Sequence, residues 1–229
     1  MVQSKSLYWH GTELISIHGE GMLGTAPQQL EKLVQDFWSV LPAHKLDPAN
    51  VVFIRLWMRD RNDAAGLAEV RERLLRGSAR SASSSFYSHD YFVGDGAVAL
   101  DMIACRATSP STRRLVDFTP PRRYAHYLVQ DNWLFLSGMA EEGQTMDQQF
   151  DRAYAEVEKA LQHEGMSWSD VTEATMFLEK GCADIGWLRS RFISATKPLP
   201  RMSFQYVDGL ATPGKNLEIE IIAHKANRS

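Results

Sequence analysis

The sequence contains only two cysteines, Cys105 and Cys182, among 229 residues. Two thiols cannot form a disulfide framework, and their spacing matches no metal-binding motif. We therefore expect no structural disulfides. Cys182 follows a glycine in an expected loop, and its role as a reactive or a bystander thiol stays open.

The sequence also lacks long apolar runs and an excess of basic residues. No stretch approaches 18 apolar residues, and no apolar run at the N-terminus precedes a cleavage site. These absences predict a cytoplasmic protein with no membrane partner. The formal net charge of −3 argues against a nucleic-acid partner, because non-specific binding needs a basic surface that displaces counterions.

Motifs of several enzyme classes are missing as well. There is no Gly-x-Ser-x-Gly elbow, no phosphate loop, and no Gly-x-Gly-x-x-Gly after an expected strand. The seven histidines are scattered and none has zinc spacing. The sequence therefore predicts neither a metal ion nor a cofactor.

The sequence does contain an internal repeat, offset by 119 to 121 residues. Residues 15–19 (Ile-Ser-Ile-His-Gly) match 134–138 (Leu-Phe-Leu-Ser-Gly), and residues 99–104 match 218–223. A repeat of this length indicates two copies of one folding unit. We predict a diverged first copy at 1–107, a polar linker at 108–121, and a second copy with the active site at 122–229.

Hydrophobic periodicity gives the expected elements. Apolar residues at helical spacing predict helices over 26–41, 63–75, 146–163 and 184–196. Alternating or β-branched segments predict strands over 14–17, 51–58, 81–87, 97–105, 124–129, 133–137, 171–178, 202–207 and 216–224. The order β-β-α-β-α-β-β predicts the α+β class, with two helices on one face of the sheet in each copy.

Three positions of the second copy are candidates for chemistry. Arg201 follows Pro198-Leu199-Pro200 and opens a strand, where a fixed guanidinium suits a planar carboxylate; a surface ion pair is the alternative. Glu218 and Glu220 share one strand face and could transfer protons, or could lie on a wetted edge.

The pair Ser137-Gly138 ends a strand. A glycine there lets a ligand approach the backbone and leaves its N–H free to donate, although an ordinary turn would also suit the pair. The first copy has Ala99 where the second has Glu218. We therefore expect the copies to differ in chemistry.

The second copy resembles the Rid family of reactive-intermediate imine deaminases, also called YjgF-like proteins. The resemblance rests on an ordered set of short motifs: Leu136-Ser137-Gly138, Gln148, Gly165-Met166-Ser167, Asp170-Val171, Arg201-Met202-Ser203, and Glu218-Ile219-Glu220 with Ala223. The first copy is similar to a diverged member, with Ala79-Arg80-Ser81 and Asp101-Met102-Ile103-Ala104.

This resemblance implies a fold of two chorismate-mutase-like units, each a mixed sheet with two helices on one face. It implies homo-oligomers, with a trimer favoured, and sites in clefts between subunits. It also implies hydrolysis of an imine or enamine, of the 2-aminoacrylate or 2-aminomuconate type, to ammonia and a carbonyl compound. No cofactor is needed, because the protein holds the small carboxylate substrate and positions one water molecule.

The resemblance also implies residue roles. Arg201 would clamp the substrate carboxylate, and Glu218 would position or activate water. Ser203 would lend its carbonyl oxygen to that water. The N–H of Gly138, beside Ser137, would contact the substrate, and Tyr124 would line the pocket.

The chain departs from the family pattern at several places. Met139 stands where glutamine is common, Gly186 falls near a usually polar position, and the loop between Arg201 and Glu218 is longer than usual. These departures favour a reshaped pocket. Arg189, Arg191 and Lys197 could contact a second carboxylate of the substrate or could be solvated helix charges.

Three other functions stay open. The protein could be a non-catalytic module that binds small carboxylates or acts as a scaffold. It could be a ribonuclease, an activity ascribed to some family members, although its acidic charge and lack of a histidine pair argue against this. It could be a hydrolase similar to the chorismatases, which share the fold and are longer.

Overall fold

The computed structural model describes residues 2–109 and 112–226. Its contacts divide the chain into two compact units, Met1–Asp131 and Asn132–Ser229. Among the described residues, no helix is long and apolar enough to cross a membrane.

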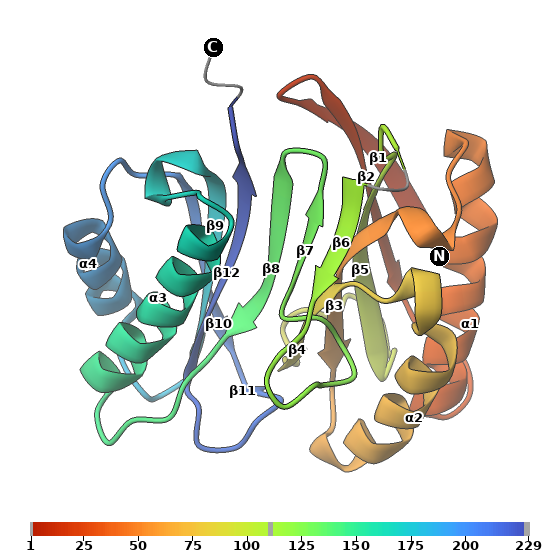
Figure 1. Cartoon of the computed structure of the whole chain (residues 1–229). Helices are drawn as coiled ribbons and strands as arrows, with labels where there is room; N and C mark the ends of the chain where they lie inside the picture. The colour runs from red at the N-terminus through yellow and green to blue at the C-terminus, as the bar shows by residue number, and fades with distance from the viewer. Residues whose placement is uncertain (1, 110–111, 227–229) are drawn as a thin grey trace. The chain divides into compact units, whose positions relative to one another are not determined.

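The first unit is a mixed sheet with two helices on one face (Figure 1). Its sheet runs β1-β2-β5-β3-β4, and only β3 and β4 are parallel. Strands β6 and β7 form an antiparallel pair. The elements are β1 (Val2–Trp9), β2 (Thr12–Glu20), α1 (Ala26–Val40), β3 (Val51–Met58), α2 (Ala64–Leu74), β4 (Ala82–Tyr87), β5 (Val98–Cys105), β6 (Arg113–Val116) and β7 (Tyr127–Gln130), with short 3-10 helices at Leu41–His44, Pro48–Asn50, Arg61–Asp63 and Gly77–Ala79.

The second unit repeats this arrangement. Its sheet runs β10-β9-β12-β8, and β10 and β9 are the parallel pair. This order matches β4-β3-β5-β2 of the first unit. The elements are β8 (Trp133–Met139), α3 (Met146–His163), a 3-10 helix (Trp168–Asp170), β9 (Val171–Glu179), α4 (Ile185–Ala195), β10 (Arg201–Val207), β11 (Gly209–Leu210) and β12 (Leu217–His224).

Equivalent glutamines make equivalent hydrogen bonds in the two units. Gln29 Oε1 accepts from the Ala97 N–H at 2.8 Å, and Gln149 Oε1 accepts from the Asn216 N–H, also at 2.8 Å. Both glutamines are buried, so each amide ties the start of a helix to the segment before the last strand. The repeat in the sequence is therefore a repeat in three dimensions, and the predicted α+β class is confirmed.

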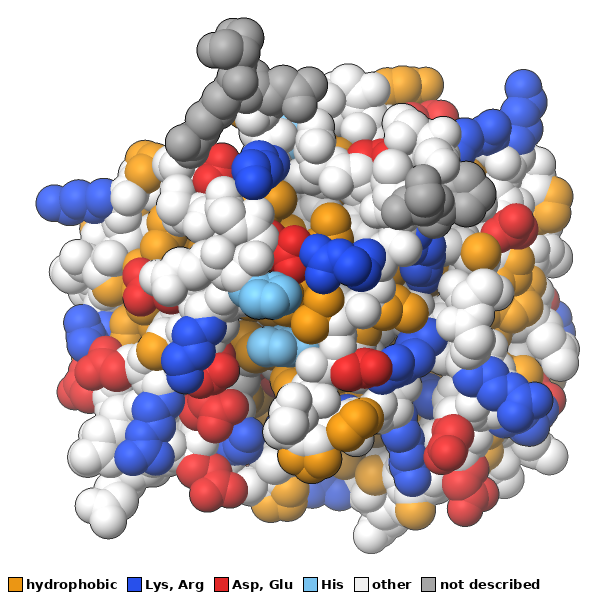
Figure 2. Space-filling model, viewed as in Figure 1, with side chains coloured by type: hydrophobic (Ala, Val, Ile, Leu, Met, Phe, Trp, Pro, Cys, Tyr) orange, Lys and Arg blue, Asp and Glu red, His pale blue; other side chains and the backbone are white. Residues whose placement is uncertain are grey.

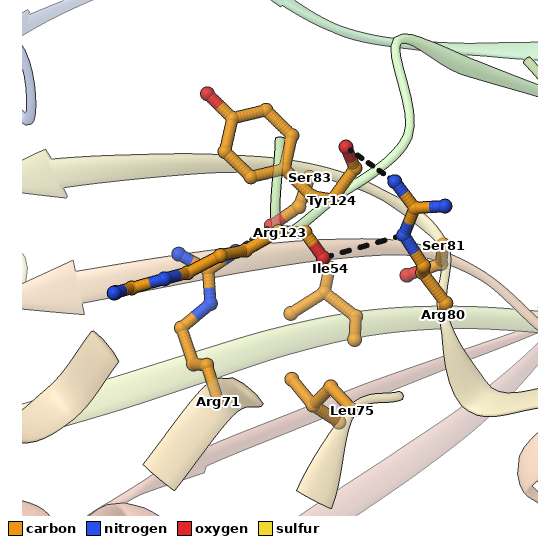
Figure 3. A pocket seen from close by; sticks show the side chains of 8 residues that line it. All are labelled: Ile54, Arg71, Leu75, Arg80, Ser81, Ser83, Arg123 and Tyr124. Atoms are coloured by element: carbon orange, nitrogen blue, oxygen red, sulfur yellow. Dashed lines mark hydrogen bonds between the residues drawn. The ribbon is translucent and has the colours of Figure 1, made fainter. Parts of the chain in front are cut away.

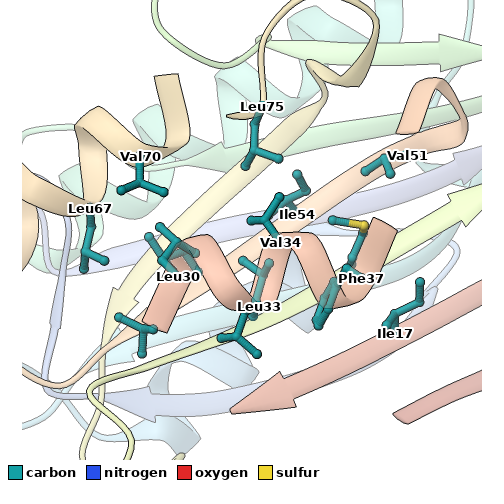
Figure 4. Close-up of a cluster of buried hydrophobic side chains, with 14 of the residues drawn as sticks. Ile17, Leu30, Leu33, Val34, Phe37, Val51, Ile54, Leu67, Val70 and Leu75 are labelled. Carbon is teal, nitrogen blue, oxygen red and sulfur yellow. The ribbon is translucent and has the colours of Figure 1, made fainter. Parts of the chain in front are cut away.

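Local sequence explains where helix α1 starts and what it buries. Thr25 caps the helix in a capping box with Gln28, whose Oε1 accepts from the Thr25 N–H at 2.9 Å. Leu30, Leu33 and Phe37 recur at helical spacing and are buried. Their side chains pack on the sheet within the core of the first unit (Figure 4).

Strand β1 was absent from the predicted elements. It pairs antiparallel with β2 over Val2–Trp9 at the edge of the sheet. Six of its eight residues are exposed, including Tyr8 at 78%. An exposed edge strand needs no alternation of apolar and polar residues, so the sequence pattern carried no strand signal.

Strand β6 lies within residues 108–121, which we expected to be a linker. The Arg113 guanidinium donates to the carbonyl oxygens of Ala49 (2.8 Å), Val51 (3.0 Å), Ser78 (3.2 Å) and Arg80 (2.9 Å). These contacts join β6 to the first unit, and the division by contacts therefore falls at 131/132. The boundary of the sequence repeat at 122 stays a prediction.

We predict that Phe37→Ala lowers the free energy of unfolding by about 3–5 kcal/mol, because it leaves a cavity beneath α1. Leu23→Ala is the control, since Leu23 is 86% exposed, and should change stability by less than about 0.5 kcal/mol. Urea titration followed by circular dichroism measures both. Equal effects of the two substitutions would contradict the position of Phe37 in the core.

Candidate active site

Three strands of the second unit carry polar side chains on the face that α3 and α4 do not cover, called here the helix-free face. The Phe204 ring lies 6.5 Å from the Phe192 ring of α4. Side chains alternate along a strand, so Arg201 and Ser203 project from the opposite face. Ser203 is level with Thr175 on β9, and Thr175 is level with Glu220 on β12.

Glu218 is the candidate whose position is most constrained. It is 8% exposed and shares the helix-free face with Glu220, which is 4% exposed. A Cβ atom at Gly138 would lie 1.6 Å from Glu218 Oε1 and 2.1 Å from its Cδ. The absence of a side chain at position 138 is therefore what admits the Glu218 carboxylate. The structure brings these two predicted residues together.

Ser203 and Ser137 lie on two different strands. The Ser203 hydroxyl is 2.9 Å from the Thr175 hydroxyl and donates to it. Ser137 is fully buried in β8, directly before Gly138. Hydroxyl groups on β10 and β9 thus stand in one row with the buried Glu220 carboxylate.

Arg201 lies at the start of β10, the edge strand of the second-unit sheet. Its side chain is exposed, and it makes no hydrogen bond or ion pair with the residues that the structure describes. Its charge is therefore available to a ligand. Arg80, its counterpart in the first copy, instead contacts Asp117 and donates to the Arg122 carbonyl oxygen at 2.9 Å.

Arg201 and Glu218 share a face but are not adjacent. Arg201 is level with Glu173, and Glu173 is level with Ile222, four residues beyond Glu218. Four strand residues span about 13 Å, and two strand spacings about 10 Å. The two backbone positions are therefore about 16 Å apart.

Tyr124 lies in the first unit and lines a hollow there (Figure 3). Its ring lies 5.6 Å from the Phe118 ring and 5.7 Å from the Arg71 guanidinium carbon. Tyr124 thus lines a hollow of the first unit, and its predicted place in the pocket of Arg201 and Glu218 stays a prediction.

The first unit has a polar cluster of its own that the sequence analysis missed. The Asp101 carboxylate accepts from His18 Nδ1 at 2.8 Å, from Trp57 Nε1 at 2.7 Å, and from the Tyr91 hydroxyl at 2.7 and 2.8 Å. Arg55 Nη1 lies 3.8 Å away. The Tyr91 ring stacks on Trp57 at 3.8 Å between centroids.

The cluster shifts the acidity of its members. The hydrogen bond to Asp101 raises the pKa of His18 above its ordinary value. Burial raises the pKa of Asp101, but the hydrogen bonds from His18, Trp57 and Tyr91 and the charge of Arg55 outweigh it and leave that pKa below its usual range. Burial and the Asp101 charge raise the pKa of Tyr91. The cluster thus holds a carboxylate beside a half-exposed imidazole ring.

The correspondence between the two copies in the sequence could have indicated this cluster. Asp101 is the counterpart of Glu220, and His18 is the counterpart of Ser137, each 119 residues apart. The replacement of Glu218 by Ala99 predicts that the copies differ in chemistry, but it gives no indication of this cluster. Among the described residues, no three His, Cys, Asp or Glu side chains are placed to hold a metal ion.

Comparisons with known proteins agree with this architecture. A family model described as Endoribonuclease L-PSP matches residues 116–225. No curated protein matches the chain. The structure is similar to that of a chorismatase, with a TM-score of 0.69 and 14% identity over 96% of this chain and 79% of that one. This likeness extends over nearly the whole chain and shows the fold.

Two shorter proteins of the YjgF family each cover half of the chain. The one from Mycobacterium tuberculosis is 24% identical over 49% of this chain and 99% of that one, with a TM-score of 0.43. The one from Neisseria meningitidis is 26% identical over 50% of this chain and 96% of that one, with a TM-score of 0.41. The likeness to the chorismatase over nearly the whole chain confirms the predicted fold of two chorismate-mutase-like units.

We predict that Gly138→Ala lowers the free energy of unfolding by about 1–3 kcal/mol, because the added methyl group displaces the Glu218 carboxylate. The matched control is the same substitution in a Glu218→Ala background, where its cost should fall below about 0.5 kcal/mol. Denaturant titrations of the four proteins complete the cycle. If the losses in free energy of unfolding of the two single variants add up to the loss of the double variant, Glu218 and Gly138 are not in contact.

The pH behaviour of His18 gives a second prediction. Its folded pKa is raised, so its contribution to stability is complete below the unfolded pKa of about 6.5 and is lost as the pH rises through the folded pKa. Titration of the His18 ring by NMR should give a pKa above about 6.5, which falls in Asp101→Asn. An unchanged pKa in that variant would contradict the ion pair.

Proposed function

We propose that this protein hydrolyses a small imine or enamine that carries a carboxylate, releasing ammonia and a carbonyl compound, because the model of the Endoribonuclease L-PSP (YjgF) family matches residues 116–225. The supporting observation is the buried Glu218 carboxylate against Gly138. It supplies a proton-transfer group whose orientation is restricted before a substrate arrives.

The reaction balances with water as the only co-reactant. An enamine such as 2-aminoacrylate takes a proton at its methylene carbon and becomes an iminium ion. Water adds to the iminium carbon, a proton passes to nitrogen, and the C–N bond breaks to leave the 2-oxo acid and ammonia. Glu218 is the group that we assign to the proton transfers to and from water.

Arg201 is the group that we assign to the substrate carboxylate. Its guanidinium has no ion-pair partner among the described residues, and its planar fork suits a carboxylate through two parallel hydrogen bonds. Ser203 and Gly138 would line the same site. The backbones of Arg201 and Glu218 are about 16 Å apart, which allows a site in which the two residues come from different copies of the chain, as in a trimer.

The first test measures ammonia release from 2-aminoacrylate generated in solution, above the uncatalysed rate. We expect Glu218→Gln to lower kcat by about 10²–10⁴-fold, and Arg201→Met to lower kcat/KM mainly through KM. Arg152→Met is the control, since Arg152 lies on the exposed side of α3. A wild-type protein that binds 2-oxo acids without releasing ammonia would support a binding module instead.

A complementation experiment tests the shared site. The Arg201→Met and Glu218→Gln chains are co-expressed with different tags, and mixed oligomers are purified through both tags. If the two residues of a site come from different chains, a site that takes Glu218 from the Arg201→Met chain and Arg201 from the Glu218→Gln chain regains activity. If the mixed oligomers are as inactive as either parent, the shared site is contradicted. The proposed reaction is not affected by that result.

Enol-ether hydrolysis is the second candidate, favoured by the likeness to a chorismatase over 96% of this chain. An enol ether beside a carboxylate, as in chorismate, also takes a proton at its methylene carbon before water attacks. The same carboxyl group could therefore serve either reaction. Release of pyruvate from chorismate, with no ammonia from 2-aminoacrylate, would decide for this candidate.

Ribonuclease activity has less support. On the face drawn in Figure 2, acidic and basic side chains are interspersed and form no continuous basic patch. The chain has a net charge of −3, and RNA binding depends on basic groups that neutralise phosphates.

A further inference from the structure

The hollow that Tyr124 lines in the first unit is rich in arginine. Arg71 reaches it from α2, Arg80 precedes β4, and Arg123 adjoins Tyr124 (Figure 3). Its innermost part, measured as the space open to the centre of a water molecule, is about 20 Å³. The whole hollow measures about 280 Å³ with its solvent-filled mouth. The inner part therefore has room for a group about the size of one water molecule, such as a single oxygen atom, and the entrance is wider.

Arg71 is the unusual member of this group. Its Nη1 donates to the Ser85 hydroxyl and its Nη2 to the Ser83 hydroxyl, both at 2.7 Å. Burial lowers the pKa of Arg71, and the charge of Arg123 lowers it further. A guanidinium carries five N–H donors, so three have no acceptor among the residues that the structure describes.

The neighbouring arginines are neutralised by carboxylates. Arg80 is paired with Asp117, and Arg123 Nε lies 3.3 Å from a Glu72 oxygen. Arg71 has no carboxylate partner within the described ranges 2–109 and 112–226. Withdrawing a charge from water is costly unless an opposite charge and hydrogen bonds compensate. The surroundings of Arg71 supply hydroxyl groups but no negative charge.

The Tyr124 ring limits the class of ligand that suits the hollow. It lies 5.7 Å from the Arg71 guanidinium carbon, within the range of a cation–π contact. Its hydroxyl makes no hydrogen bond to the described residues and can donate or accept. A flat ring, a planar guanidinium and two serine hydroxyls suit a flat anion with two adjacent oxygens, which is a carboxylate.

We propose that the first unit holds a carboxylate-binding site in which Arg71 pairs with the carboxylate of a small 2-oxo acid, beside Ser83 and Tyr124. A carboxylate oxygen enters the inner part of the hollow, and the rest of the acid lies in the mouth. The residues of this site belong to the first unit and include neither Arg201 nor Glu218, so its test does not depend on the reaction proposed above.

The experiment uses pyruvate as the probe and the Arg201→Met protein as the background, so that the proposed catalytic clamp does not contribute. Calorimetric titration in chloride-free buffer should show pyruvate binding to this background. Adding Arg71→Met should weaken the binding by about 10- to 100-fold, the loss of a hydrogen-bonded charge pair. Arg73→Met is the matched control on α2, because Arg73 pairs with Glu31 at 2.8 Å, and it should leave affinity unchanged.

Two further measurements keep the proposal testable if Arg71→Met folds poorly. Arg71→Lys retains the charge but loses the planar fork, and should bind pyruvate with intermediate affinity. Amide NMR signals of Ser83, Ser85 and Tyr124 should shift as pyruvate is added to the background protein. The proposal is overturned if the background protein does not bind pyruvate, if folded Arg71→Met binds it equally well, or if those signals do not move.

Discussion

Two helices cover one face of each sheet, and these helices decide on which face the strands can present polar side chains. Because side chains alternate along a strand, every polar residue that avoids the helices is directed to the other face. In the second unit this face holds Glu218, Glu220 and Ser203; in the first it holds His18 and Asp101. The amphipathic packing that stabilises each unit therefore also groups its reactive side chains.

The two copies use the same scaffold for different chemistry. Gln29 and Gln149 make matching hydrogen bonds, so the frame around each sheet is preserved. Within that frame the second unit presents a buried carboxylate against Gly138, whereas the first presents a carboxylate that accepts hydrogen bonds from three side chains. A carboxylate surrounded by donors is held as an anion, which suits a fixed charge better than repeated proton transfer.

Compensation of charge separates the arginines of this chain into two groups. Arg80 and Arg123 are neutralised by carboxylates, and Arg113 fills its donors with backbone carbonyl oxygens. Arg71 and Arg201 lack such partners among the described residues. Arg201 is exposed to water, which screens its charge, while Arg71 is partly buried and has less access to that screening. Arg71 and Arg201 are consequently candidate positions for a bound anion.

The sequence by itself determined the duplication, the four helices and the strand face that Glu218 and Glu220 share. These properties follow from periodicity and spacing, which are local along the chain. The tertiary structure decided the rest: the exposed edge strand β1, the contact between Gly138 and Glu218, the donors around Asp101 and the isolation of Arg71. Each of these depends on register or packing between segments far apart in sequence, and residue order alone does not specify which side chains meet across them.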